Sequence, residues 1–256
     1  MSEIFYPKCY GLYSGGKDSA AMCQVLHEAG KLEACVALET GLNTPDWKEF
    51  IQRSCDQRGW AVEFYKTTSS YEEWILKWGF PGPRKHSWIM NILKGRGVQQ
   101  FRKYRPGAIL ASGTRIYESG RRKMTAKPVS MWEGVPILAP ILDWTTEEKW
   151  GFVNDHGFER APGYATLRIS GDCLCGAMAG EGEKEAIDFH YPEIGKYFDD
   201  LGEQIKDKHP KRCKWGWGAN QPEGKKTAAE ELICVECPRS RELFPETLPT
   251  VGLQTT

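Results

Sequence analysis

The chain has 256 residues and a mass of 29.0 kDa, which is enough for one large domain or for one domain with a small appendage. Hydrophobic residues make up 40% of it and charged residues 27%, so we expect a packed core and exclude an intrinsically disordered chain. No apolar run approaches the roughly 18 residues of a membrane-spanning helix. Nine cysteines without a secretory signal before them predict a cytoplasmic protein without a disulfide framework.

Strand and helix patterns alternate along the first part of the chain. Short buried runs indicate strands, and apolar residues at helical spacing indicate helices. The predicted strands cover residues 9–13, 32–38, 61–65, 108–111 and 136–141, and the predicted helices cover 20–29, 47–58, 71–78, 88–103 and 146–154. This alternation predicts an α/β fold with a parallel sheet covered by helices on both faces. Ligands of such sheets bind at the carboxyl ends of the strands.

The composition changes after residue 160, where Gly, Cys and Trp become frequent and strand patterns end. Helices are predicted here over 184–190 and 193–208. We therefore divide the chain into a sheet domain over 1–160 and a Cys-rich appendage with a C-terminal tail over 161–256. So small a unit buries little apolar surface by itself, which is typical of a region that a bound metal stabilises.

The segment Ser-Gly-Gly-Lys-Asp-Ser follows the first predicted strand and opens the first helix. Two glycines allow a tight turn close to an anion, and the helix start offers N–H groups and the positive end of its dipole. The residues expected to hold a phosphate or sulfate group are Ser14, Gly15, Gly16, Lys17, Asp18 and Ser19. Asp18 is expected either to orient the loop or to lie near Mg²⁺ on a triphosphate. The Walker pattern G-x-x-x-x-G-K-[ST] is absent, so this is a different phosphate loop.

This loop resembles the PP-loop of the adenine nucleotide alpha hydrolase-like superfamily, which includes N-type ATP pyrophosphatases and the phosphoadenosine phosphosulfate (PAPS) and adenosine phosphosulfate (APS) reductases. Three further segments are similar to the reductase branch. They are L-E-T-G at 38–41 with Thr44-Pro45, G-T-R-I-Y-E-S-G-R-R at 113–122, and P-I-L-D-W-T-T-E-E-K-W at 140–150 with His156-Gly157. Glu39 stands where that family has Asp.

The resemblance covers roughly residues 8–180 and implies a Rossmann-like α/β fold around a PP-loop nucleotide-binding domain. It implies an adenine nucleotide as ligand, which is PAPS, APS or ATP with Mg²⁺. It also implies that further residues outside the loop belong to the nucleotide site. These are Glu39, Thr40, Gly113, Arg115 and Arg121.

Basic residues concentrate between positions 84 and 127, where 12 Lys and Arg residues accompany a single acid, Glu118. Because Lys and Arg total 34 and Asp and Glu also total 34, this segment predicts a local site for a polyanion. A solvated helix face is the alternative. Arg115 and Arg121 follow a predicted strand, and guanidinium groups bind phosphate or sulfate through paired hydrogen bonds. We expect both to contact the nucleotide from the wall opposite the loop.

The cysteines form two groups. Cys9, Cys23, Cys35 and Cys55 have apolar neighbours and are expected in the core. The appendage holds the other five, Cys173, Cys175, Cys213, Cys234 and Cys237. A C-x-C and a C-x-x-C on irregular segments predict a four-cysteine metal site, and reduced thiols without a metal are the alternative. We prefer a [4Fe–4S] cluster to zinc because several PAPS/APS reductases carry one, and Cys213 is the weakest candidate ligand.

The predicted function is a PAPS-reductase-like oxidoreductase or sulfur transferase that binds an adenine nucleotide and handles sulfur. No cysteine follows Cys237, whereas assimilatory reductases attack sulfate with a cysteine near the C-terminus. The alternatives are therefore an ATP pyrophosphatase that adenylates a nucleic acid for thiolation or phosphorothioation, and a nucleic-acid-associated accessory protein with a vestigial nucleotide site. No catalytic residue is assigned. The expected partners are the nucleotide, a reductant such as thioredoxin or a nucleic acid, and further copies of the chain, but no membrane.

Two further segments, one before a predicted helix and one near the second group of cysteines, also have predicted roles. Asp143 is expected to cap the helix predicted over 146–154. A basic cluster at 206–214 precedes Trp215 and Trp217. Basic residues beside exposed tryptophans can bind phosphates and stack bases. Tryptophans beside a cysteine can instead cover a metal site, which is the interpretation we prefer for this pair.

Overall fold

The computed structural model describes residues 7–220, apart from the side chains of Arg121, Ala219 and Asn220. Six strands form one sheet in the order β3-β2-β1-β4-β6-β5. They are β1 (Cys9–Leu12), β2 (Leu32–Glu39), β3 (Val62–Lys66), β4 (Leu110–Ala111), β5 (Val129–Trp132) and β6 (Val135–Leu138). All neighbouring pairs of these strands are parallel except β5 and β6 at the edge. The predicted parallel sheet is confirmed, with an antiparallel edge strand added to it.

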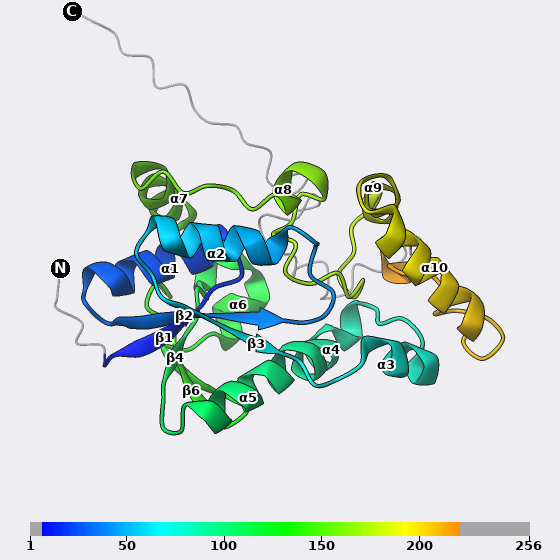
Figure 1. Cartoon of the computed structure of the whole chain (residues 1–256), viewed down its shortest axis with the longest axis horizontal. Coiled ribbons are helices and arrows are strands. Elements are labelled where there is room, and N and C mark those ends of the chain that lie inside the picture. Colours follow the sequence, from blue (N-terminus) through cyan, green and yellow to red (C-terminus); the bar gives the residue numbers. More distant parts are fainter. Residues whose placement is uncertain (1–6, 221–256) are drawn as a thin grey trace, which may run out of the picture.

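Helices cover both faces of the sheet, as predicted (Figure 1). One face carries α1 (Lys17–Glu28), α2 (Trp47–Gln57) and α7 (Thr146–Asp155), and the other carries α5 (Arg96–Tyr104). Alternate side chains of β2 enter the two cores, with Ala37 under α1 and α2 and Val36 against α5. A strand buried on both faces needs an apolar residue at nearly every position, which explains the continuous apolar run in the sequence.

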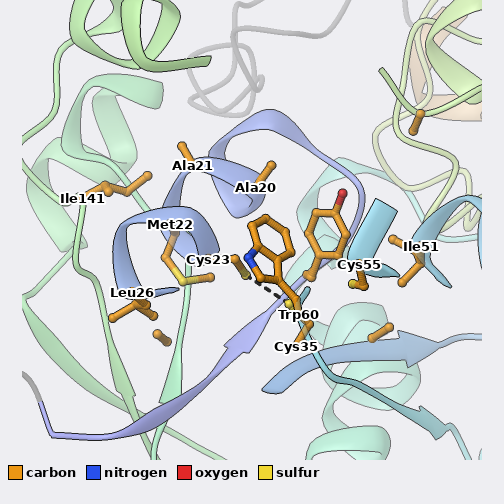
Figure 2. Packing of buried hydrophobic residues seen from close by; sticks show 14 of the residues in the cluster. Ala20, Ala21, Met22, Cys23, Leu26, Cys35, Ile51, Cys55, Trp60 and Ile141 are labelled. Atoms are coloured by element: carbon orange, nitrogen blue, oxygen red, sulfur yellow. Dashed lines mark hydrogen bonds between the residues drawn. The ribbon is translucent and has the colours of Figure 1, made fainter. Parts of the chain in front are cut away.

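The four N-terminal cysteines are core residues, as predicted. Cys9, Cys23, Cys35 and Cys55 are completely buried. Figure 2 shows Cys23, Cys35 and Cys55 gathered around the indole of Trp60, and the sulfur atoms of Cys23 and Cys35 lie 3.6 Å apart. Burial raises the pKa of the Cys9 thiol to about 11. This thiol therefore stays protonated at neutral pH and behaves as a small apolar side chain.

β5 and α6 (Gly120–Thr125) are not among the predicted elements. β5 and β6 form a hairpin whose turn is Glu133-Gly134, with φ angles of 51° and 76°. Two central residues with positive φ are typical of a type I′ turn, whose twist matches that of the strands it joins. Glu-Gly is a weaker signal for this turn than Asn-Gly or Asp-Gly, which explains why the sequence does not predict the hairpin.

The predicted helix over 88–103 contains a change of winding. α4 (His86–Met90) continues through a π-helical turn, Asn91–Gly95, into α5. Such turns are rare and are frequent at functional sites. Here the π-helical turn brings Lys94 to the edge of the cavity described below.

Thr145, and not Asp143, caps α7. The Thr145 hydroxyl accepts a hydrogen bond from the Glu148 N–H at 3.1 Å, and the Glu148 carboxylate accepts one from the Thr145 N–H at 2.8 Å. The prediction for Asp143 is therefore wrong. The Thr-x-x-Glu spacing forms a capping box, which satisfies two N–H groups where a lone Asp would satisfy one.

A second core lies beside the sheet, where α3 (Tyr71–Trp78), α9 (Glu183–His190) and α10 (Pro192–Ile205) pack together (Figure 1). It includes Phe80 from before residue 160 and Trp215 from after it. The two parts of the chain thus share this core, and a domain boundary at residue 160 stays a prediction. The remaining short helices are α8 (Gly163–Thr166) and the 3₁₀ turns Pro83–Lys85, Ile116–Glu118 and Trp217–Asn220. None of the helices in residues 7–220 is long and apolar enough to cross a membrane.

Candidate functional site

The glycine-rich loop joins β1 to α1 at the carboxyl end of the sheet. Gly15 has φ +84°, and a Cβ there would lie 3.2 Å from the Phe50 ring, so this position requires glycine. Gly16 is the N-cap of α1 in an extended conformation, and no side chain caps the helix. The first backbone hydrogen bond of α1 runs from Ala20 N to Gly16 O at 2.9 Å. The uncapped first turn, with the positive end of the helix dipole, is suited to an anion.

Hydroxyl groups surround the start of α1. The Ser19 hydroxyl donates to Gly16 O at 2.7 Å, and its oxygen lies 3.3 Å from that of Ser14. The Trp47 indole N–H donates to Ser14 O at 2.9 Å and ties the loop to α2. A Cβ added at Gly16 would lie 3.4, 3.6 and 3.8 Å from the hydroxyl oxygens of Ser14, Tyr164 and Ser19, respectively. We call this space in front of Gly16 the hydroxyl cradle.

The hydroxyl cradle opens into a cavity of about 460 Å³. β1 lies between β2 and β4, so the strand order reverses at this point of the sheet and leaves a crevice at the strand ends. The apolar part of the wall comes from Leu12, Val36, Leu38, Met90, Trp132 and Ile137. The polar part includes Ser14, Asp18, Ser19, Lys94, Ser112, Thr114, Glu118, Arg122, Ser130, Ser170 and Asp172. The cavity thus combines an anion-binding end with an apolar wall.

Lys17 does not line this cavity. Its side chain is buried, and its ammonium lies 3.4 Å from the centroid of the Trp150 ring and 5.8 Å from that of Tyr164. A cation over an aromatic face is stabilised by the ring quadrupole. In this structure the Lys17 ammonium thus lies against these rings, and its predicted contact with a ligand stays a prediction.

Asp18 and Arg115 form a buried ion pair. The Arg115 side chain is 1% exposed, its Nε bonds to Asp18 Oδ1, and its Nη1 donates to Trp144 O at 3.2 Å. Gly113 approaches the same turn so closely that a Cβ there would lie 2.5–2.7 Å from the backbone atoms of Asp18 and Ser19. The structure thus brings Gly113 and Arg115 to the loop, where Arg115 holds Asp18 in place. Arg115 does not itself line the cavity.

Glu39 and Thr40 lie at the end of β2 but do not line the cavity. The Glu39 carboxylate pairs with Lys48 at 2.7 Å. The Thr40 hydroxyl is buried, accepts from Leu42 N at 3.2 Å and donates to Asp172 O at 3.3 Å. Thr40 thus holds the backbone of Asp172, which is a residue of the cavity wall.

The segment with Cys173 and Cys175 runs along the cavity edge. Backbone hydrogen bonds join Thr44 N to Gly171 O at 2.8 Å and Leu174 N to Leu42 O at 2.9 Å. The Asp172 side chain lines the cavity and pairs with Lys94 from the π-helical turn. These contacts attach the C-x-C segment to the loop that follows β2, so both cysteines lie close to the cavity.

A sequence profile of the phosphoadenosine phosphosulfate reductase domain matches residues 8–197, which is most of the chain. The chain belongs to this family. An uncharacterized protein of Methanocaldococcus jannaschii is 25% identical over 160 residues, which are 58% of this chain and 38% of that protein. The chain thus spans well under half the length of that relative.

Among solved structures, the PAPS reductase of Candida auris in a phosphate complex is 13% identical in sequence to this chain, and the TM-score of the two structures is 0.46. The comparison covers 62% of this chain and 77% of that one. The Candida glabrata FMN adenylyltransferase in complex with FMN and the ATP analog AMPCPP is 15% identical in sequence to this chain, with a TM-score of 0.40. That comparison covers 59% of this chain and 49% of the other.

Arg122 and Lys94 are cations of the cavity wall that are not among the predicted site residues. The Arg122 Nη1 donates to Thr114 Oγ1 at 2.8 Å, and its Nε lies 3.2 Å from Glu118 Oε2. Burial raises the pKa of Glu118, although Arg122 opposes this shift. The Arg-Arg doublet of this PAPS reductase family member is the sequence signal that points to Arg122. The side chain of Arg121 lies outside the described residues.

The predicted metal ligands are only partly within the described residues. A hydrogen bond from Cys175 and the positive charge of Lys94 lower the pKa of Cys173, although burial raises it. The same hydrogen bond, together with burial, raises the pKa of Cys175. The Cys213 sulfur donates to Pro210 O at 3.3 Å. Within residues 7–220, no three His, Cys, Asp or Glu side chains gather as a metal site. Cys234 and Cys237 lie outside the described residues.

Proposed function

We propose that this PAPS reductase family member is an enzyme that binds an adenine nucleotide in the cavity and acts on its sulfate or phosphate end. The hydroxyl cradle carries the proposal, because it places an uncapped helix start and three hydroxyl groups around a space that a single methyl group would fill. A phosphate or sulfate oxygen accepts hydrogen bonds from such groups. The apolar wall of Leu12, Val36 and Leu38 suits a purine base.

Two reactions are compatible with this site. A reductase or sulfur transferase acts on PAPS or APS, and a thiol takes part in the transfer. An ATP pyrophosphatase instead adenylates an acceptor and releases pyrophosphate. The second reaction is favoured by the cavity wall, because no cysteine is among the described residues that line it. The first is favoured by Cys173, which directly follows the wall residue Asp172.

Calorimetry with ATP and Mg²⁺, APS and PAPS, each offered separately, tests the proposal. We expect at least one of the three to bind. Sulfite released from APS or PAPS, with a dithiol present to supply the two electrons, would identify the reductase reaction. Pyrophosphate released from ATP in the presence of an acceptor would identify adenylation. Failure of all three nucleotides to bind the full chain would contradict the proposed function.

Replacing Gly16 by alanine should remove nucleotide binding without unfolding the protein. The φ and ψ angles of Gly16 are −79° and 155°, which alanine adopts readily. Its new methyl group would meet no atom closer than 3.4 Å but would fill the hydroxyl cradle. We expect the nucleotide affinity to fall by about ten-fold or more. The free energy of unfolding should change by no more than about 1 kcal/mol. Calorimetry and thermal denaturation measure the two effects, and unchanged affinity would place the anion elsewhere.

We further propose that Cys173 and Cys175 are two ligands of a thiolate-bound metal site. In its support, Cys173 and Cys175 are two residues apart, glycines flank the segment, and the sequence offers Cys234 and Cys237 as further ligands. Protein purified without oxygen should contain about four irons with sulfide, or about one zinc, per chain. Cys173→Ser should lower this content by about half or more, whereas Cys213→Ser should not. Metal-free protein that remains folded would contradict this proposal.

A further inference from the structure

Exposed tryptophans gather at the corner between α3 and α4. The side chains of Trp78 and Trp88 are 46% and 38% exposed. Their ring centroids lie 6.5 Å apart at an interplanar angle of 85°, and Trp88 also packs edge-on against Trp74 at 4.6 Å. Large exposed apolar side chains that lie together mark an interaction surface more often than isolated ones do.

Cations from two distant parts of the chain surround these rings. The Lys77 ammonium lies 5.3 Å from the Trp78 centroid, and the Lys85 ammonium lies 6.0 Å from the Trp88 centroid. The segment after α10 packs against the same corner, because Lys208 Nζ donates to Leu76 O at 3.3 Å. Two basic clusters that are separate in the sequence thus form one surface.

We call this corner the tryptophan-basic surface and define it by Lys77, Trp78, Lys85, Trp88, Lys208 and Arg212. Arg212 packs against Gly79, where a Cβ would lie 2.7 Å from that of Arg212, and Phe80 N donates to Arg212 O at 2.8 Å. None of the four cations forms an ion pair with another residue in the described part of the chain. Their charges therefore attract an anionic partner.

Trp215 and Trp217, which follow the basic cluster at 206–214, are engaged in packing. Trp215 is buried, lies against Phe198 with centroids 5.3 Å apart, and donates from Nε1 to Leu174 O at 2.9 Å. Trp217 covers Gly82 and donates to Phe80 O at 2.8 Å. Trp78 and Trp88 take their place as the aromatic side chains beside the basic residues.

We propose that the tryptophan-basic surface binds single-stranded nucleic acid. Exposed indoles stack on bases, and the surrounding Lys and Arg side chains contact the phosphates. A duplex keeps its bases stacked inside and would leave the two indoles unused, whereas a single strand offers its bases to them. Trp88 lies on α4, which continues directly into the π-helical turn that carries the cavity residue Lys94. The proposal goes beyond the proposed function, because it concerns a different ligand and different residues.

Fluorescence anisotropy with a labelled 20-nucleotide oligo(dT) tests the proposal on the full chain, at roughly 50 mM and 200 mM salt. We expect binding that weakens with salt. Trp78→Ala should weaken it by about five-fold or more, since each stacked base contributes that much. Lys77→Glu should lower the slope of log affinity against log salt by about one. We choose Trp78 because Trp88 also packs on Trp74, so that its loss could disturb the fold.

Two matched variants serve as controls at the end of α5. Tyr104 is 66% exposed among basic neighbours, and Lys103 lies in the last turn of its helix as Lys77 does in α3. Tyr104→Ala and Lys103→Glu should leave the affinity within about two-fold. The proposal is overturned if oligo(dT) does not bind, if a control variant weakens binding as much as its partner variant, or if a duplex binds as tightly as the single strand. Equal competition by polyglutamate would overturn it in favour of an acidic protein partner.

Discussion

Gly113→Ala is expected to destabilise the protein by about 3 kcal/mol and to abolish nucleotide binding. A Cβ at this position would lie 2.5–2.7 Å from the carbonyl carbon and oxygen of Asp18 and from Ser19 N. These are backbone atoms of the first turn of α1, so no change of rotamer can relieve the overlap. Either the loop after β4 or the start of α1 must move, and both form part of the cavity wall.

Chemical denaturation and calorimetry with the nucleotide measure both effects. Gly151→Ala is the matched control, because Gly151 lies inside α7 with ordinary helical geometry and a Cβ there would meet no atom within 4 Å. The control should be neutral or slightly stabilising, by up to about 1 kcal/mol, since alanine favours the helix. A Gly113→Ala protein as stable as the control would show that the two segments do not pack as closely as described.

Arg115→Met is expected to destabilise the fold by about 3 kcal/mol, because it leaves the Asp18 carboxylate without its partner in a largely buried site. The side chains of Arg115 and Asp18 are 1% and 15% exposed, respectively. Nucleotide affinity should fall as well, since Asp18 lines the cavity and would repel the anionic end of the ligand once its charge is uncompensated.

A double-mutant cycle with Asp18→Asn separates the ion pair from other effects. The double variant Asp18→Asn, Arg115→Met should be less destabilised than the sum of the single variants, by about 1–3 kcal/mol, because no charge then remains buried alone. Arg53→Met is the control, since Arg53 pairs with Glu159 at 3.2 Å on the surface and should contribute about 0.5 kcal/mol or less. Additive effects at Asp18 and Arg115 would contradict the buried pair.

Local sequence signals were sufficient where the deciding contacts are local. The Ser14–Ser19 segment predicts a loop between a strand and a helix, because glycine spacing and a polar helix start depend on neighbouring residues alone. The apolar run of β2 predicts a strand buried on both faces for the same reason. The hairpin of β5 and β6 was missed because its Glu-Gly turn is a weak local signal.

The sequence by itself thus determined the fold class, the family and the position of the phosphate loop in the chain. The directions of Lys17 and Arg115 were decided only by the tertiary structure, since Trp150 and Asp18 lie far from them in sequence. Lys208 and Arg212 likewise join the tryptophan-basic surface only because the segment after α10 packs against α3. A buried charged side chain contacts the partner that compensates its desolvation. Packing of distant parts of the chain decides which residue is that partner, so the residue types and spacing near the charge do not predict it.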